Sequence, residues 1–315
     1  VANITCNVEP LQVAYDPANG YIYVTSWIYN GSNLTGALFV INPSTNRVIT
    51  VIRFMLGLND ITYDPANGYI YVTTLSGNIF VINPTTNQVI ANITTVETHG
   101  DIVYDPSNEY LYVTDFSNSV YVINSSTNQV IATIQVGYLP AGITYDPSNG
   151  YIYVVNEGSG TVSVINPSTN QVIAIIQVGG HPYSIAYDPA NGYLYVTNPA
   201  LNAVSVINPS TNQVIANITV GGESGIAPAD ITYDPSNGFI YVTDSGLGTV
   251  TVIDPATNTV VGNITVGIYP QGIVYDPSNG YLYVANFGSG TISIIATANE
   301  TAEYSVTFIE SGLPS

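Results

Sequence analysis

Short apolar runs alternate with polar turn segments along the whole chain. In one stretch the apolar, strand-like runs are 141–145, 151–155, 161–165 and 171–178, and the segments between them are rich in Asn, Pro, Ser and Gly. β-Branched and aromatic residues favour strands, whereas Gly, Pro, Asn and Asp favour the turns that join strands. The pattern therefore predicts a meander of four strands.

This unit occurs seven times, and each copy contains a Tyr-Asp-Pro turn. The opening tyrosines, spaced by 41 to 48 residues, are Tyr15, Tyr63, Tyr104, Tyr145, Tyr187, Tyr233 and Tyr275. A repeat of this length that contains only strands is typical of a β-propeller blade. We therefore expect an all-β fold, a seven-bladed β-propeller over residues 1–298.

The two ends of the repeat array indicate how the ring closes. The seventh unit has strand-like runs at 271–275, 281–285 and 291–295 but no fourth run. Residues 1–8 resemble the missing strand, as a comparison with 215–220 shows. We expect the N-terminal strand to pair beside 291–295, which closes the ring and limits aggregation through sheet edges.

The segment 299–315 breaks the repeat. Tyr304, Val306 and Phe308 alternate with polar residues, which predicts a half-buried strand. Two explanations stay open. The segment is the first strand of a following domain, or residues 300–315 join a neighbouring subunit by β-augmentation.

The Asp-Pro-x-Asn-Gly segment of each unit is a turn signature, because Pro fixes φ and Asn-Gly tolerates positive φ. It has a faint likeness to a calcium loop, but the distal bidentate Glu of such a loop is missing. In the third unit Glu109 stands where the others have Gly. We therefore expect backbone strain or a different geometry at that turn.

Charged residues are scarce. They make up 7% of the chain, the net charge is −19, and the only strong bases are Arg47 and Arg53. Nothing here would neutralise phosphates, so nucleic acid is a poor partner, and no apolar run approaches the roughly 18 residues of a membrane span. With few salt bridges, little stability should be lost as carboxylates protonate, which suits an acidic habitat.

The single cysteine, Cys6, can form no internal disulfide, and we expect it to be a small core residue.

Sequons for N-glycosylation are frequent. They lie at Asn3, Asn30, Asn33, Asn92, Asn124, Asn217, Asn263 and Asn299. Four of them recur as Asn-Ile-Thr at one position of the repeat. Glycans there would supply the solvation that charges do not, and the alternative is that Asn and Thr simply fill the solvent face of a strand. We predict that some of the sequons are occupied.

A phrase at the end of the second strand carries a family resemblance. It reads Tyr195-Val-Thr-Asn198, with variants such as Tyr283-Val-Ala-Asn286 and Tyr112-Val-Thr-Asp115. These motifs resemble the YVTN family of β-propeller repeats, found in archaeal and bacterial surface-layer and secreted proteins. The tail phrase Phe-x-Glu-Ser-Gly-Leu-Pro looks like the opening strand of a β-domain common in archaeal secreted proteins. The resemblance implies a seven-bladed propeller at the cell surface and no particular activity.

The loops that vary between units mark the face where we expect function. Two positions there should lie near the mouth of the central channel: the residue after the second strand, and the residue before the Ile or Val of the inner strand. The acids at these positions are Asp60, Asp101, Asp115, Asp230 and Asp244. Glu157 lies close by in sequence.

Three interpretations of these acids compete. They satisfy loop amides or are solvated; or they bind a hard cation such as calcium; or the pairs Asp101 with Asp115 and Asp230 with Asp244 perform acid–base chemistry on a glycan. The interpretation as a cation site has an analogy at the level of the fold, because lactonase-type propellers hold a metal at the channel mouth. Calcium is therefore the one cofactor to consider.

Four further residues are candidates for binding a ligand or partner. Trp27, the only tryptophan, and Tyr29 lie in the longest insertion, 26–37, where aromatic rings would stack on sugars or dock a partner, unless Trp27 only caps the blade edge. His99 and His181 lie in inter-blade loops on the same face. One cysteine and two histidines exclude a Cys/His zinc cage, and no Gly-x-Ser-x-Gly elbow is present.

Together these features favour an extracellular structural or adhesive module whose partners are surface proteins or glycans. Two alternatives stay open. One is a carbohydrate-active or lactonase-like enzyme with an acidic or calcium site at the channel mouth. The other is a subunit of an extracellular filament or lattice.

Overall fold

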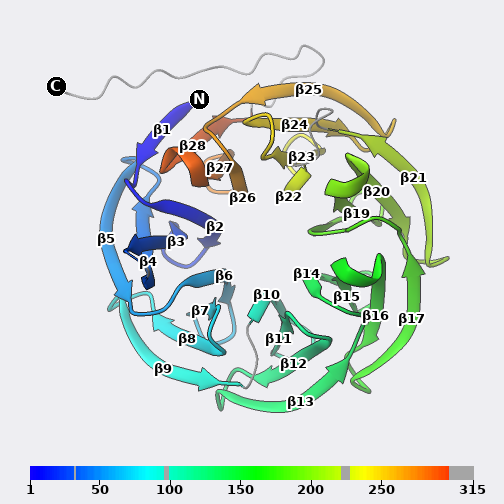
Figure 1. Ribbon diagram of the computed structural model, residues 1–315, viewed down its shortest axis with the longest axis horizontal. Helices are drawn as coiled ribbons and strands as arrows, with labels where there is room; N and C mark the ends of the chain where they lie inside the picture. The colour runs from blue at the N-terminus through cyan, green and yellow to red at the C-terminus, as the bar shows by residue number, and fades with distance from the viewer. Residues whose placement is uncertain (32, 96–98, 221–227, 298–315) are drawn as a thin grey trace.

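Seven four-stranded antiparallel sheets surround a central axis (Figure 1), so the predicted seven-bladed β-propeller is confirmed. The computed structural model describes residues 1–31, 33–95, 99–220 and 228–297. Within these ranges no helix combines the length and apolar character needed to cross a membrane.

The strands follow the repeat. Blade 1 contains β2 (Glu9–Asp16), β3 (Tyr21–Asn30), β4 (Asn33–Asn42) and β5 (Arg47–Phe54). Blade 2 contains β6 (Leu58–Asp64), β7 (Tyr69–Thr74), β8 (Asn78–Asn83) and β9 (Gln88–Thr94). Blade 3 contains β10 (His99–Asp105), β11 (Tyr110–Asp115), β12 (Ser119–Asn124) and β13 (Gln129–Gln135). Blade 4 contains β14 (Pro140–Asp146), β15 (Tyr151–Asn156), β16 (Thr161–Asn166) and β17 (Gln171–Gln177).

The remaining blades have the same plan. Blade 5 contains β18 (Ile185–Asp188), β19 (Tyr193–Asn198), β20 (Ala203–Asn208) and β21 (Gln213–Thr219). Blade 6 contains β22 (Pro228–Asp234), β23 (Phe239–Asp244), β24 (Thr249–Asp254) and β25 (Thr259–Thr265). Blade 7 contains β26 (Pro270–Asp276), β27 (Tyr281–Asn286), β28 (Thr291–Ala296) and β1 (Ala2–Thr5). Short 3-10 helices η1 (Glu157–Ser159), η2 (Pro199–Leu201) and η3 (Phe287–Ser289) follow β15, β19 and β27.

The N-terminal strand closes the ring as predicted. β1 pairs antiparallel with β28, with Ala2 opposite Ile294 and Thr5 opposite Thr291. Cys6 is buried beside Ile4 in the cluster between blades 7 and 1, which confirms its assignment to the core. Residues 298–315 lie outside the described residues, and so does the strand predicted at 304–308.

The Asp-Pro turn has the same geometry in every blade. In blade 4 the Oδ1 atom of Asp146 accepts the N–H of Ser148 at 2.8 Å, and Asn149 donates from Nδ2 to the buried Tyr153 hydroxyl at 2.9 Å. Seven copies of this network fix the turn and hold the tyrosine in the core. This confirms the turn and explains why Tyr, Asp and Asn recur together.

The threonine of the Tyr-Val-Thr phrase links neighbouring blades. In blade 2 the buried Thr73 Oγ1 accepts the N–H of Asp60 at 2.9 Å and donates to the carbonyl of Gly100 in blade 3 at 3.0 Å. Equivalent threonines in blades 1, 3, 5 and 6 make the same pair of bonds. Blades 4 and 7 have Val155 and Ala285 at this position. The phrase is therefore an inter-blade connection as well as a strand.

The hydrophobic core lies between the blades. One cluster combines Tyr23, Leu38 and Val40 of blade 1 with Ile70 and Val72 of blade 2, all fully buried. Burying an aliphatic or aromatic side chain of this size stabilises the fold by roughly 1.5–3 kcal/mol. Interdigitation around the ring thus joins seven sheets into one body.

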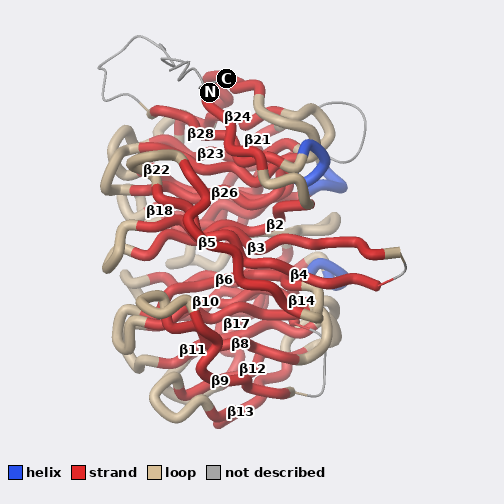
Figure 2. Tube along the Cα trace, turned by 90° about the vertical axis from the view of Figure 1, so that its left-hand side faces the viewer, coloured by secondary structure: helices blue, strands red, loops and turns tan. Residues whose placement is uncertain are grey.

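Two local features depart from the repeat. Glu109 adopts φ 61°, in the left-handed region that the equivalent glycines occupy, which confirms the predicted backbone strain. The insertion at 26–37 extends the sheet of blade 1, because β3 and β4 continue as a paired ribbon in which Trp27 lies opposite Gly36 and Tyr29 opposite Leu34. Cross-strand pairing satisfies the backbone groups that a loop would leave to water. The ribbon projects from the face on which the 3-10 helices lie (Figure 2).

Candidate functional site

Three carboxylates lie on the inner strands of separate blades. Asp60 of β6, Asp101 of β10 and Asp230 of β22 occupy the position before the inner-strand Ile, and all three are half-buried. Burial raises the pKa of Asp101, and the charges of Asp60 and Asp230 raise it further, so the three groups interact electrostatically across the blades. Three of the five predicted acids are therefore within electrostatic range of one another.

Two of these carboxylates already have hydrogen-bond partners in the protein. Asp60 Oδ2 accepts the N–H of Ile102 in the next blade at 2.8 Å. Asp230 accepts the Ser184 hydroxyl at 2.7 Å and the N–H of Ile273 at 3.0 Å. Burial nevertheless raises the pKa of Asp60 to about 7 and that of Asp230 above its ordinary value. Both side chains connect neighbouring blades.

Asp101 differs from its two neighbours. Its carboxylate has no hydrogen-bond partner within the described ranges, and burial together with the two nearby acids raises its pKa well above the ordinary range. Burial raises the pKa of the Tyr183 hydroxyl, and the charges of Asp101 and Asp230 raise it further. A carboxylic acid with a raised pKa and a phenol can both donate a proton, which is the chemistry that a general acid supplies.

The other two acids accept hydrogen bonds from the backbone of the loops that follow them. Asp115 is buried, and its Oδ1 accepts the N–H groups of Ser117 and Ser119 at 2.8 and 2.9 Å. Asp244 is also buried, accepts the N–H of Leu247 at 3.3 Å, and leaves Oδ2 without a partner. Neither is among the charges that shift Asp101 or Asp230. The structure thus favours the loop-capping interpretation for this position.

The calcium prediction has no assembled ligand set in the described part of the chain. Within it, no group of three or more His, Cys, Asp or Glu side chains is arranged to hold a metal ion. The sequence-based proposal of a cation at the channel mouth stays a prediction.

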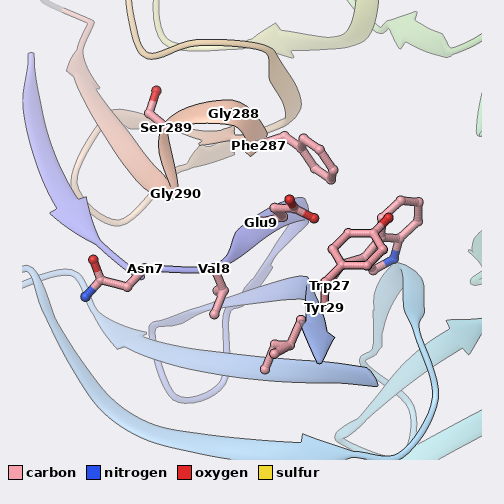
Figure 3. A pocket seen from close by; sticks show the side chains of 10 residues that line it. Asn7, Val8, Glu9, Trp27, Tyr29, Phe287, Gly288, Ser289 and Gly290 are labelled. Carbon is pink, nitrogen blue, oxygen red and sulfur yellow. The ribbon is translucent and has the colours of Figure 1, made fainter. Parts of the chain in front are cut away.

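A groove opens where blade 7 meets blade 1. It has a volume of about 370 Å³ and lies between the β3–β4 ribbon, the segment that links β1 to β2, and η3. Figure 3 shows the rings of Trp27, Tyr29 and Phe287 and the carboxylate of Glu9 around this space. Tyr29 is 57% exposed. The groove therefore presents aromatic surface to an incoming ligand.

Trp27 contacts two neighbouring blades. Its indole N–H donates to the carbonyl of Leu58 in blade 2, and its ring meets Phe287 edge to face with centroids 5.7 Å apart. These contacts join three blades and fix the orientation of the indole. A ring held in this way loses little conformational entropy when a ligand binds.

Glu9 adds a polar group to the aromatic residues that line the groove. It begins β2 directly opposite Trp27, and its Oε2 atom is buried without a hydrogen-bond partner. A desolvated carboxylate oxygen without a donor is unfavourable, so a ligand that supplies an O–H would lower the free energy of the bound state. Ser289 also lines the groove, and its hydroxyl accepts the N–H of Ile268.

Sequence reasoning missed Glu9 and Phe287, which lie far apart in the chain and meet only because the ring closes. It also missed Tyr183. The signal for Phe287 was present, because it is an aromatic residue directly after β27, where a 3-10 helix exposes it to the face.

The histidines and the sequon asparagines differ in how far their side chains are exposed. His181 is exposed, and its backbone N–H donates to Asn198, whereas the His99 side chain lies outside the described atoms. The asparagines that are exposed and accessible to a glycan are Asn3, Asn33, Asn92, Asn217 and Asn263. Asn124 is half-buried at the end of β12. The Asn30 side chain and Asn299 lie outside the described part.

Comparisons with known proteins agree with the fold. A family model described as Lactonase, 7-bladed beta-propeller matches residues 176–310, which is less than half of the chain. Hydrazine synthase of Kuenenia stuttgartiensis is similar in structure, with a TM-score of 0.80 at 17% identity, over 94% of this chain and 98% of that chain. No curated protein matches the chain. These likenesses identify a β-propeller, a fold that carries many different activities.

Proposed function

We propose that this chain is an extracellular interaction module that binds carbohydrate in the groove between blades 7 and 1. The observation that carries the proposal is the clustering of Trp27, Tyr29, Phe287 and Glu9 around a space of about 370 Å³. Aromatic rings pack against the C–H faces of a sugar ring, and a carboxylate accepts hydrogen bonds from its hydroxyls. The volume lies at the lower end of the range of ligand pockets, roughly 300–1,000 Å³.

The surface chemistry supports an uncharged, hydroxyl-rich ligand. With a net charge of −19, the protein repels anions, and its two arginines lie on β5, outside the groove. A neutral sugar carries no charge for this field to repel. The predicted surface location rests on the frequent sequons and the YVTN resemblance, and mass spectrometry of the native protein for N-glycans tests it.

A glycan array tests the binding proposal. We expect wild-type protein to bind a subset of neutral glycans and the Tyr29→Ala variant to lose at least about tenfold in affinity. Tyr138→Ala is the matched control, because Tyr138 is also an exposed tyrosine, at 60%, in an inter-blade segment away from the groove. Equal loss in both variants, or no binding by the wild type, would refute the proposal.

A second candidate is lactonase-like hydrolysis at the channel mouth. It is favoured by the family match and by Asp101, whose raised pKa and lack of a hydrogen-bond partner suit a general acid. Hydrolysis of a lactone panel by the wild type, lost in Asp101→Asn while the fold persists, would support this candidate. Absence of turnover in the wild type would remove it.

A further inference from the structure

The carboxylate of Glu9 lies beside the indole of Trp27 in the groove between blades 7 and 1. The two residues are directly opposite each other where β2 pairs with β3. Side chains paired in this way stand on the same face of a sheet, with Cβ atoms roughly 4.5–5.5 Å apart. Figure 3 shows the carboxylate pointing toward the rings of Trp27, Tyr29 and Phe287. An acid is therefore held against aromatic surface.

The aromatic rings form a corner around this acid. The planes of Trp27 and Phe287 are nearly perpendicular, at 84°, with centroids 5.7 Å apart. The indole N–H donates to the carbonyl of Leu58, which fixes the orientation of the ring. The face of an aromatic ring attracts a cation, because the π electrons give that face a negative charge density. The corner therefore favours a positively charged group over a neutral group of the same size.

No base of the protein balances the charge of Glu9. The chain has two arginines and no lysine, and both arginines lie on β5, outside the groove. Among the described residues that line the groove, Glu9 is the only charged one. The net charge of −19 also concentrates cations at the surface of the protein.

The buried Oε2 atom of Glu9, which has no hydrogen-bond partner, distinguishes between two kinds of donor. A hydroxyl would satisfy its hydrogen bonding and leave the charge of the carboxylate uncompensated. An ammonium group supplies both the donor and the opposite charge, and such charge-assisted hydrogen bonds are about twice as strong as neutral ones.

We propose that the sugar which this groove selects carries a free amine. Its ammonium group lies against Glu9 and the neighbouring ring faces, and the C–H face of the sugar packs on the rest of the aromatic surface. Neutral sugars make only the second contact and are weaker ligands. This inference rests on the proposed carbohydrate binding and adds the chemical class of the ligand.

Two tetrasaccharides test the inference: cellotetraose and the glucosamine tetramer of the same linkage. They differ only in an amine for a hydroxyl on each ring. At about pH 6 primary amines are protonated, and we expect the wild type to bind the glucosamine tetramer at least about tenfold more tightly in a calorimetric titration. Raising the pH to about 9 deprotonates the amine and should abolish this preference without any substitution in the protein.

Glu9→Gln should remove the preference at about pH 6 and leave the affinity for cellotetraose within about twofold, because the amide keeps the shape of the side chain and one acceptor oxygen. The matched control is Glu157→Gln in η1, the counterpart of η3 in blade 4. Both acids are half-buried. The two variants have the same net charge, so a general attraction between a polycation and this acidic protein would change equally in both. Circular dichroism confirms that each variant is folded.

The outcomes separate this inference from the proposed function. Equal affinity for the two tetramers, weakened in both cases by Tyr29→Ala, would overturn the inference and leave carbohydrate binding intact. A preference that falls equally in Glu9→Gln and Glu157→Gln, or that persists at about pH 9, would overturn it too. So would binding of amine-free glycans in the array by a protein that binds neither tetramer. A wild type that binds no glycan at all would refute the proposed function and this inference together.

Discussion

Lowering the pH from 7.5 to 4.5 should stabilise this propeller, and Asp60 is one of the groups that carry the effect. Burial raises the folded-state pKa of Asp60 from 3.8 to about 7. The folded protein therefore binds this proton more tightly than the unfolded chain does. Stability from this source is fully present below about pH 4 and is lost as the pH rises through about 7.

The magnitude follows from the two pKa values. One pKa unit corresponds to about 1.36 kcal/mol, so the interval from 3.8 to about 7 amounts to about 4 kcal/mol. Relaxation and water entry reduce this, and we expect a gain of about 2–4 kcal/mol, or about 3–6 °C in melting temperature for a chain of this length. Asp101 and Asp230 act in the same direction, because their pKa values are also raised.

Urea unfolding of the wild type and Asp60→Asn at several pH values measures the effect. The side-chain carbonyl of the introduced asparagine can still accept the N–H of Ile102, so the variant should be more stable than the wild type at pH 8 and less dependent on pH. A wild type whose free energy of unfolding falls between pH 7.5 and 4.5 would refute this reasoning. It would also contradict the link to an acidic habitat.

Three further substitutions test which interactions stabilise the fold. Glu109→Gly should stabilise the fold by about 1 kcal/mol in urea unfolding, because φ 61° strains a residue that has a Cβ, whereas Glu109→Ala should not. Thr73→Val should destabilise by roughly 2–4 kcal/mol, because the N–H of Asp60 and the carbonyl of Gly100 would lose their partner inside the protein; a loss below 1 kcal/mol would contradict the inter-blade role. Cys6→Val should change the free energy of unfolding by less than about 1 kcal/mol, since both side chains are small and apolar, and a large loss would show that the thiol has a specific role.

The fold could be predicted from the sequence because each blade repeats its own local chemistry. Asp146, Asn149 and Tyr153 lie within eight residues of one another and form their network inside one turn. Ring closure could be predicted too, because residues 2–5 repeat a strand that the seventh unit lacks. Strand type, turn type and blade number are local or periodic properties, and periodicity is visible in a sequence.

The site could be predicted only in part because it depends on distances between blades. Asp60, Asp101 and Asp230 were identified by their position in the repeat, but pairing Asp101 with Asp115 required a direction for each side chain, and the β11–β12 loop uses Asp115 as a cap. Trp27 and Tyr29 were identified as unusual residues. Their neighbours Glu9 and Phe287 come from the two ends of the chain and meet through closure.

The fluorescence of Trp27 tests the central claim most directly, because it is the only tryptophan in the chain and lines the groove. Titration with a glycan that binds in the array should shift or quench this emission with the dissociation constant of binding, and Tyr29→Ala should weaken the response at least about tenfold. An emission spectrum that stays constant while the glycan binds would place the ligand elsewhere and contradict the account.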